Sequence, residues 1–436
     1  MMIVHYNTEA VLQATSNLLS WFETVEQREG LGGPVVHWWG STFDYCGPGM
    51  DWRLEGYLLS LLNLFKLTED DTYLKRILKY VELFERYSYK DGSLRVSHFQ
   101  ANPMNVGSPH ESAAYYGLAS VAAFFKKEQL STEASKMAKL VGVYINSFLL
   151  NKLWNDTLKC FNDWPYSIFD IVTPNKVATI INLLFSAQNL LETDYSYYIK
   201  HCADWILRKQ SSYGKTRGGI CQTHRKYENL FFPYYNSRCV IPLQKAYDLT
   251  GNKEYLECKN NVIDFILRNA NSDFGFKQIV VADGEDIDNP RWIAGMGDIL
   301  HALLYADSAN DKVKEIIENN LNFVLCMQMK SGVFPAAQGF SSNKTSFKDI
   351  FPVSGWNDKM LNFLTRLLTF GINEKIDMPA STVGTERREC FYDGKEMLFE
   401  ETERHITLYD LKTEEIFYLW NKKEIFPEIV RIQAVE

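Results

Sequence analysis

Apolar side chains recur along this chain in stretches with helical spacing, separated by polar loops that contain Gly and Trp. Leu12, Leu18, Leu19 and Phe22 show this spacing in the first stretch. Six stretches of a second kind begin near Asp51, Pro109, Pro174, Tyr234, Trp292 and Trp356, at spacings of 58, 65, 60, 58 and 64 residues. Another amphipathic stretch precedes the loop before each of them. This repeat of about sixty residues predicts six helical hairpins.

Because every long loop falls in the same half of the repeat, the hairpins are expected to close into a ring with all six loops at one mouth. The more apolar helices are expected to form an inner ring, over residues 51–67, 110–127, 175–192, 236–249, 292–306 and 356–370. The more charged helices are expected outside, over residues 8–26, 71–87, 131–149, 195–209, 253–269 and 311–328. Pro242 predicts a kink in the fourth inner helix, or a helix that begins later.

An internal match supports this repeat. The segment 67–74, Leu-Thr-Glu-Asp-Asp-Thr-Tyr-Leu, resembles the segment 249–256, Leu-Thr-Gly-Asn-Lys-Glu-Tyr-Leu. The offset equals three repeats of about sixty residues. Each copy is expected to end one helix and to pack its Tyr-Leu pair at the start of the next.

The pattern changes after Ile372. Residues 389–399 predict two short strands around an Asp-Gly turn, residues 405–409 alternate, and residues 416–420 are apolar and aromatic. The chain therefore divides into a toroid over residues 1–372 and a small β-rich appendage over residues 373–436 that packs on the ring. The predicted fold class is all-α with this C-terminal addition.

Composition narrows the function classes. The net charge of −8 argues against a nucleic-acid partner, which requires a basic surface. No apolar run is long enough to span a membrane, and the first residues do not form a secretory leader. The eight cysteines form no CxxC pair, and no other metal motif is present. We therefore expect a cytoplasmic protein without metal or cofactor, whose oligomeric state stays open.

The alternating inner and outer helices, the Thr-Gly-Asn-Lys-Glu-Tyr-Leu turn and the segment 291–296, Arg-Trp-Ile-Ala-Gly-Met, resemble the six-hairpin (α/α)6-toroid superfamily. The resemblance covers residues 8–370 and is one of architecture. It implies a carbohydrate-active enzyme, since the superfamily includes glycoside hydrolases, unsaturated glucuronyl hydrolases, polysaccharide lyases and sugar epimerases. Toroids also serve terpene cyclases, so the fold alone does not decide the reaction.

Catalytic candidates are carboxylates at the starts of neighbouring inner helices. Asp51 and Glu111 form the predicted acid/base pair, and Asp44 or His110 is expected to tune one of them. Inner helices about 8–10 Å apart would bring two such carboxylates to the separation that glycosidases use. The alternative for Asp51 and Glu111 is a capping role at the helix start.

The expected substrate ligands are aromatic rings and charged groups around the same mouth. Aromatic faces pack on the C–H faces of sugars, and Arg binds a carboxylate such as a uronate through two hydrogen bonds. Helix capping, loop packing and structural ion pairs are the alternatives for each residue. The candidates are Trp38, Trp39, Arg53, Tyr235, Arg238, Arg291, Trp292, Trp356 and Asp358.

These features favour a glycoside hydrolase that uses carboxylates and acts on a small oligosaccharide, neutral or uronic. A lyase or an epimerase would use the same residue types. A carbocation cyclase would need a dry apolar cavity instead. A non-catalytic binding protein would show exposed mouth carboxylates that do not converge.

Overall fold

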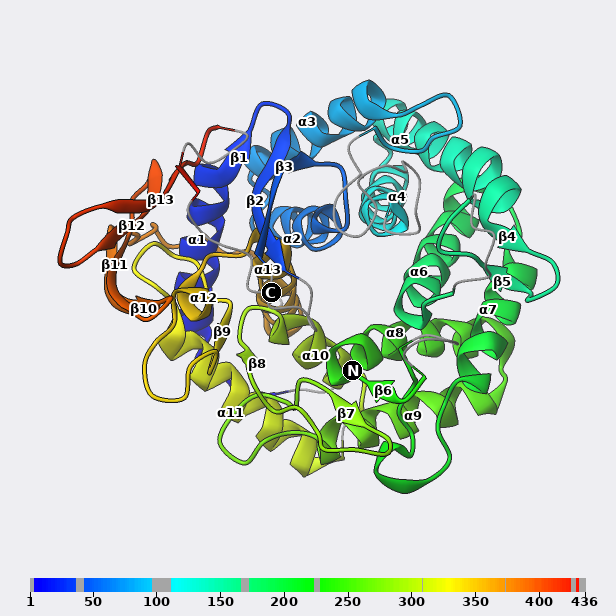
Figure 1. Cartoon of the computed structure of the whole chain (residues 1–436). Coiled ribbons are helices and arrows are strands. Elements are labelled where there is room, and N and C mark those ends of the chain that lie inside the picture. The colour runs from blue at the N-terminus through cyan, green and yellow to red at the C-terminus, as the bar shows by residue number, and fades with distance from the viewer. Residues whose placement is uncertain are drawn as a thin grey trace.

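The computed structural model describes residues 4–36, 43–95, 111–165, 172–222, 228–307, 309–372, 374–424 and 429–430, and for residues 34–36, 43–49, 131 and 429–430 it describes the backbone. Six helices surround a common axis, and six more lie outside them (Figure 1). The inner helices are α2 (Arg53–Thr68), α4 (Glu111–Lys127), α6 (Pro174–Leu191), α8 (Pro233–Thr250), α10 (Met296–Leu303) and α13 (Ser354–Gly371). Each contacts the next, and α13 contacts α2, so the ring is closed.

The outer helices are α1 (Thr8–Val25), α3 (Asp71–Tyr87), α5 (Ser131–Val143), α7 (Ser196–Arg208), α9 (Lys253–Arg268) and α11 (Asp311–Met327). A π-helical segment, η1 (Tyr144–Leu153), continues α5. Helices α3, α5, α7 and α9 each pack mainly on the inner helix that precedes them, whereas α1 packs on α13. The (α/α)6 toroid is thus confirmed. The predicted hairpins pair each outer helix with the inner helix that follows it in the chain, and this pairing is wrong, because these outer helices contact mainly the inner helix before them and α1 contacts α13, which precedes α2 in the closed ring.

The repeated turn has the same structure in both copies. Glu69 and Gly251 adopt left-handed backbone conformations and end α2 and α8. Asp70 and Asn252 then cap α3 and α9 by accepting hydrogen bonds from Thr72 and Glu254 backbone N–H groups. The tyrosines three positions after these caps, Tyr73 and Tyr255, are buried. The match between segments 67–74 and 249–256 therefore marks equivalent positions in the ring.

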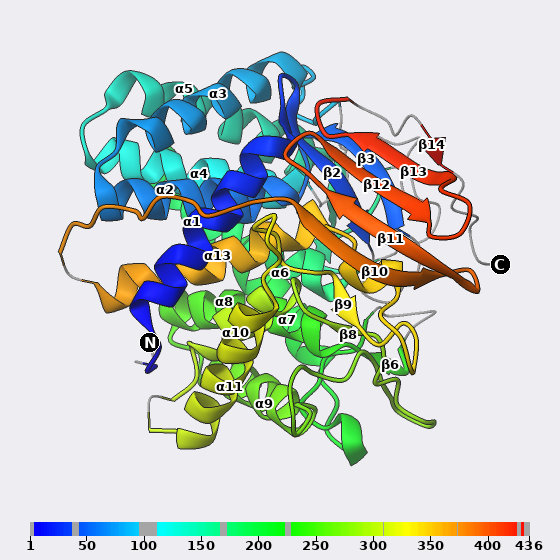
Figure 2. The same ribbon diagram turned by 90° about the vertical axis from the view of Figure 1, so that its left-hand side faces the viewer.

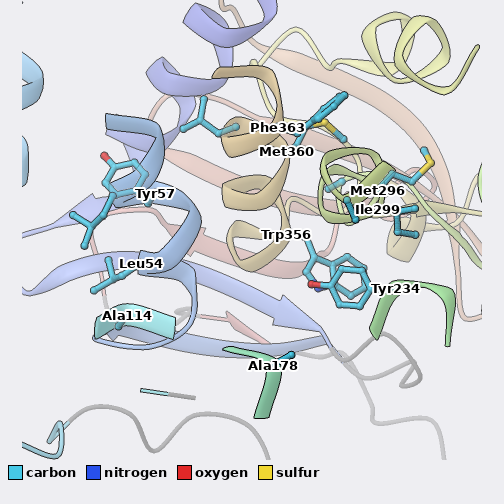
Figure 3. Close-up of a cluster of buried hydrophobic side chains, with 14 of the residues drawn as sticks. Leu54, Tyr57, Ala114, Ala178, Tyr234, Met296, Ile299, Trp356, Met360 and Phe363 are labelled. Atoms are coloured by element: carbon cyan, nitrogen blue, oxygen red, sulfur yellow. The ribbon is translucent and has the colours of Figure 1, made fainter. Parts of the chain in front are cut away.

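Helix α8 runs through Pro242 without interruption and begins at Pro233, so the expectation of a later start is wrong. Pro233 supplies the first residue of the helix, where a missing N–H group costs nothing. The core of the ring draws on every inner helix. Figure 3 shows Leu54, Ala114, Ala178, Ile299 and other residues of this buried cluster, which the six inner helices supply together.

Short strands join the loops at the N-terminal ends of the inner helices. A three-stranded sheet precedes α2 and consists of β1 (Glu26–Gln27), β2 (Gly30–Val36) and β3 (Phe43–Gly49). The sequence predicts a loop over much of this region, and the structure has strands there instead. Three two-stranded pairs follow: β4 (Trp154–Asn155) with β5 (Cys160–Phe161), β6 (Leu230–Phe231) with β7 (Val280–Val281), and β8 (Arg291–Trp292) with β9 (Ala337–Gln338). Two short helices, η2 (Gly214–Thr216) and α12 (Phe347–Ile350), complete the loops.

The C-terminal part forms the expected β structure, a five-stranded antiparallel meander (Figure 2). Its strands are β10 (Glu386–Tyr392), β11 (Lys395–Glu401), β12 (His405–Asp410), β13 (Ile416–Asn421) and β14 (Ile429–Val430). Asp393 and Gly394 both have positive φ, as a tight two-residue hairpin requires. Buried residues such as Phe399 and Trp420 belong to the same hydrophobic cluster as the ring, so the sheet and the ring share a core.

Candidate active site

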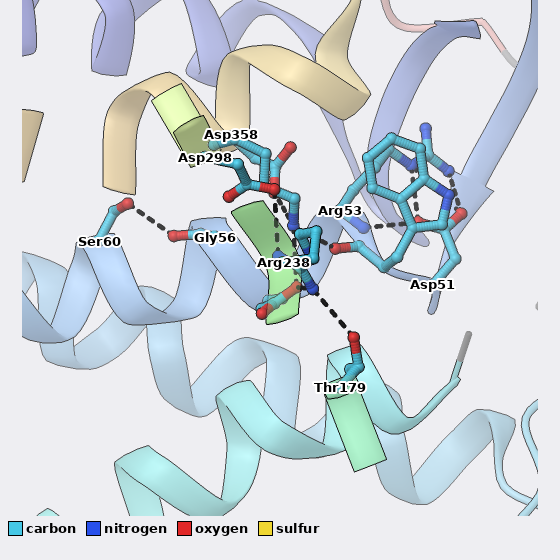
Figure 4. Close-up of polar contacts among 11 residues, drawn as sticks. Asp51, Arg53, Gly56, Ser60, Thr179, Arg238, Asp298 and Asp358 are labelled. Carbon is cyan, nitrogen blue, oxygen red and sulfur yellow. Dashed lines mark hydrogen bonds and ion pairs between the residues drawn. The ribbon is translucent and has the colours of Figure 1, made fainter. Parts of the chain in front are cut away.

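An ionic cluster lies among the first turns of the inner helices (Figure 4). Arg238 of α8 donates hydrogen bonds to Glu55 of α2 at 2.6 Å, to Asp298 of α10 at 3.1 Å and to Thr179 of α6 at 3.1 Å. Lys359 of α13 binds the same Glu55 oxygen at 3.1 Å. Five of the six inner helices thus meet at one group of side chains, which we call the Arg238 cluster: Glu55, Thr179, Arg238, Asp298, Asp358 and Lys359.

Burial and charge give the carboxylates of the Arg238 cluster different properties. Burial alone would raise the pKa of Glu55, but the charges of Arg238 and Lys359 outweigh it and lower this pKa to about 2. Burial raises the pKa of Asp358 well above its ordinary value, and the negative charges of Asp298 and Glu55 add to this effect although Lys359 lies 2.9 Å away. One carboxylate is therefore held ionised beside another that favours its proton.

Two glycines allow the helices to approach closely enough for these contacts. A Cβ atom on Gly297 of α10 would lie 2.5 Å from the carbonyl oxygen of Lys359, and one on Gly56 of α2 would lie 2.5 Å from Oδ2 of Asp358. Real side chains do not tolerate such distances. The absence of a side chain at Gly56 and Gly297 therefore sets the spacing of α2 and α10 against α13.

Asp51 and Arg53, both predicted site residues, form a buried ion pair with each other. The Arg53 guanidinium donates from Nε to Asp51 Oδ1 at 2.9 Å and from Nη2 to Oδ2 at 2.8 Å, and Nη1 reaches the carbonyl of Gly33 at 3.2 Å. Arg53 has no exposed surface. This ion pair connects β2 to the start of α2. The geometry therefore does not support Arg53 as a ligand for a substrate, and it favours a structural role for Asp51.

Glu111 is the first residue of α4 and is fully buried. Its Oε2 atom accepts a hydrogen bond from the backbone N–H of Leu94 at 3.1 Å, which ties the preceding loop to the helix. Asp358, which belongs to the Arg238 cluster, is also fully buried. Of the predicted charged residues, Asp51 and Arg53 pair with each other, whereas Arg238 and Asp358 both belong to the Arg238 cluster.

Two of the predicted aromatic ligands, Trp292 and Trp356, pack against each other, with Tyr234 of α8 beside them. The rings of Trp292 and Trp356 meet edge to face with centroids 4.4 Å apart, and Tyr234 lies 6.3 Å from Trp356. Both indoles are almost completely buried. The two indoles pack together near the N-terminal ends of α10 and α13. Tyr235, next to Arg238 along α8, keeps partial exposure, as Arg238 does, and these two residues are better placed for a ligand.

Of the remaining predicted residues, the structure describes the side chain of Arg291. Arg291 binds the exposed Asp273 at 2.6 Å and lies over the ring of Phe274, away from the Arg238 cluster. Asp44 belongs to β3, and its side chain lies outside the described part of the chain. Trp38, Trp39 and His110 also fall outside the described residues. Their predicted roles remain predictions.

Sequence reasoning missed Glu55, Asp298 and Lys359. A single acid in the first turn of a helix ordinarily indicates favourable interaction with the helix dipole, so nothing in the sequence marked Glu55 or Asp298. One usable signal existed: each is the third residue of an inner helix. Equivalent positions in a closed ring lie at the same height, so polar residues there should converge.

Among the described residues, no group of three or more His, Cys, Asp or Glu side chains is arranged to hold a metal ion. Within the same ranges, no helix is both long enough and apolar enough to cross a membrane.

Comparison with known proteins confirms the fold. No protein-family model matches the chain, and no curated protein matches it either. Among solved structures, an unsaturated glucuronyl hydrolase specific for heparin is similar, with a TM-score of 0.61 and 12% identity, covering 85% of this chain and 100% of the other. A D-mannose isomerase gives 0.62 and 13%, with coverages of 84% and 98%. The cellobiose 2-epimerase of Bacillus thermoamylovorans gives 0.59 and 12%, with coverages of 82% and 98%.

Proposed function

We propose that the protein is a carbohydrate-active enzyme, and specifically a glycoside hydrolase that acts on a small neutral or uronic oligosaccharide. The observation that carries this proposal is the convergence of three carboxylates, from α2, α10 and α13, on two cations: the partly exposed Arg238 pairs with Glu55 and Asp298, and Lys359 pairs with Glu55 and Asp358. The similar structures named above are a hydrolase, an isomerase and an epimerase of sugars. At their level of identity they support the fold, and the residues of the site must support the chemistry.

Glycoside hydrolysis needs one carboxyl group that donates a proton and one that is ionised. Asp358, whose pKa is raised, suits the acid that protonates the leaving oxygen, and because it has no exposed surface the proposal requires the side chains that cover it to move when a sugar binds. Glu55, whose pKa is lowered to about 2, suits the ionised partner that stabilises positive charge at the sugar carbon or activates water. Arg238 is placed to bind a hydroxyl or carboxylate group of the substrate. The pair Asp51 and Glu111 remains a second assignment.

The same observation separates the alternatives. A carbocation cyclase needs an apolar cavity, whereas charged side chains from α2, α8, α10 and α13 occupy this end of the ring. A binding protein would present exposed carboxylates without convergence, and Glu55, Asp298 and Asp358 are buried together. Epimerase and lyase chemistry use the same residue types, so the products must decide between them and hydrolysis.

The test is a screen of neutral and uronic oligosaccharides with product analysis by mass spectrometry. A hydrolase adds one water across the broken bond, a lyase leaves an unsaturated sugar, and an epimerase leaves the mass unchanged. In the first case, Glu55→Gln and Asp358→Asn are each expected to lower kcat/KM by at least about 100-fold, the contribution of an acid or base. Arg238→Met should raise KM most for uronic substrates.

Asp311→Asn provides the control, because this carboxylate is exposed on the outer helix α11. It should retain full activity. If Glu55→Gln and Asp358→Asn stay folded and fully active while Asp51→Asn and Glu111→Gln do not, the assignment moves to the Asp51 pair. A screen in which no sugar is turned over and none shifts the melting temperature would contradict the proposed function.

A further inference from the structure

A second charged layer lies deeper in the ring. Lys245 follows Arg238 by seven residues on α8, and Arg366 follows Lys359 by seven residues on α13. Residues seven positions apart lie on the same face of an α-helix, two turns and about 10 Å apart along its axis. The two cations therefore project on the same sides of their helices as the Arg238 cluster, toward the C-terminal ends. Neither is needed for the chemistry proposed above.

Lys245 meets aromatic groups of neighbouring inner helices. Its Nζ atom lies 3.3 Å from the hydroxyl of Tyr116 on α4, 4.6 Å from the centre of that ring and 5.4 Å from the ring of Phe185 on α6. Lys245, Arg366, Tyr116 and Phe185 all keep some solvent-accessible surface. The four side chains are therefore largely, but not completely, removed from solvent.

Lys245 and Arg366 have no ion-pair partner in the part of the chain that the structure describes. Within the described ranges, no group accepts a hydrogen bond from the Arg366 guanidinium, whose Nε atom is buried. His301 of α10 is also buried, and its Nε2 atom has no partner among these residues. Buried cations are ordinarily paired, and unpaired ones raise the free energy of the fold.

The electrostatic consequences are visible in the neighbouring groups. Burial and then repulsion by Arg366 lower the pKa of Lys245 to about 7, although Glu55 acts in the other direction. Burial and then Arg366 lower the pKa of His301 to about 3. Lys66 at the end of α2 also has a lowered pKa, through burial and then Arg366. The layer is thus a place where positive charge accumulates without compensation.

The helix dipoles do not account for this arrangement. A cation is stabilised by a helix C-terminus only within the last turn. Lys245 precedes the end of α8 at Thr250 by five residues, and Arg366 precedes the end of α13 at Gly371 by five. Glu55, the carboxylate that acts on both Lys245 and His301, is already bound by Arg238 and Lys359.

We propose that this layer is a binding site for a small oxyanion, held between the Arg366 guanidinium and the Lys245 ammonium with the Tyr116 hydroxyl as a further donor. An oxyanion offers the several acceptor oxygens that a guanidinium and an ammonium group can share. It would supply the missing negative charge and relieve the repulsion between the two cations. The ligand class is inorganic phosphate, or a carboxylate small enough to enter the ring.

The first test measures the melting temperature in sodium phosphate and in sodium formate, against sodium chloride of equal ionic strength. Either oxyanion should stabilise the wild-type protein beyond the chloride control. Arg366→Met and Lys245→Met should weaken this binding at least about tenfold, since each removes a charged hydrogen bond. Lys200→Met, which removes an exposed lysine of the outer helix α7, should leave it unchanged.

The second test follows protons by titration calorimetry in two buffers of different ionisation heat. The groups acting on Lys245 are Arg366, Glu55 and Tyr116. Because the pKa of Lys245 is lowered to about 7, binding of formate, which does not itself titrate between pH 5.5 and pH 8, is expected to draw in a proton at pH 8 and almost none at pH 5.5. Lys245→Met should abolish this uptake. If phosphate, formate and chloride gave the wild-type protein the same melting temperature, the proposal would be overturned. This outcome does not depend on any activity of the protein toward sugars.

Discussion

Glu55 is the carboxylate that both cations of the Arg238 cluster bind. It accepts hydrogen bonds from Arg238 and Lys359, and its pKa falls from 4.5 to about 2. A carboxylate with a lowered pKa in the folded state stabilises the fold above the unfolded pKa, and that contribution is lost as pH falls from about 4.5 to 2. Glu55→Gln should therefore cost on the order of a few kcal/mol at pH 7 and flatten the acid side of the stability curve.

The measurement is urea unfolding of wild type and variant between pH 2 and pH 7. Glu192→Gln serves as the control, because this exposed carboxylate pairs with Lys126 on the surface. It should follow the wild-type curve, as surface ion pairs contribute little. Parallel curves for Glu55→Gln and wild type in acid would show that the ion pairs of Glu55 do not stabilise the fold.

At the scale of the element, the ring depends on helices that touch through glycine. Alanine ordinarily stabilises a helix by up to about 1 kcal/mol over glycine. At Gly297 the added Cβ would meet the backbone of α13, so Gly297→Ala is expected to destabilise the protein by about 1–3 kcal/mol as the helices separate. Chemical unfolding measures this change. If the separation also disrupts the Arg238 cluster, the stability of the variant should depend less on pH in acid than that of the wild-type protein.

Gly142 supplies the matched comparison, since it also lies within a helix, α5. A Cβ atom there would meet only methyl groups of Leu191, at 3.6 and 3.7 Å, which is ordinary contact. Gly142→Ala should therefore leave stability unchanged or raise it by up to about 1 kcal/mol. Equal effects at the two positions would mean that the close approach of α10 and α13 is not required.

The sequence predicted the elements better than their contacts. Periodicity placed all twelve helices of the ring, because each buries one apolar face or all faces. It did not predict the β2 and β3 strands, whose Gly32, Gly33, Gly47 and Pro48 read as loop, since Gly and Pro have low strand propensity. It also predicted Arg238 and Asp358 but not their partners, because their convergence depends on the register of four helices around an axis, which no local pattern encodes.

At the scale of the whole molecule, one buried group joins the C-terminal sheet to the ring. Glu401 of β11 has no exposed surface and accepts hydrogen bonds from Trp21 of α1 at 2.7 Å and from Ser331 at 2.7 Å, and it pairs with the buried Lys422 at 2.8 Å. Removing one partner of a buried ion pair leaves the other charge uncompensated. Since the sheet and the ring also share a hydrophobic core, we expect them to unfold together although the sequence divides at about residue 372.

Glu401→Ala is therefore expected to destabilise the whole protein by about 3–5 kcal/mol and to keep a single unfolding transition, observed by differential scanning calorimetry. Glu400→Ala, one residue earlier on the same strand, removes a partner of the exposed Arg387 and should change stability by less than about 1 kcal/mol. Two separate transitions in the wild-type protein, with only the smaller one shifted by Glu401→Ala, would instead establish the sheet as an independent unit. A single shifted transition would mean that the sheet and the ring unfold as one cooperative unit, consistent with the contacts between α1 and α13 and the core that they share.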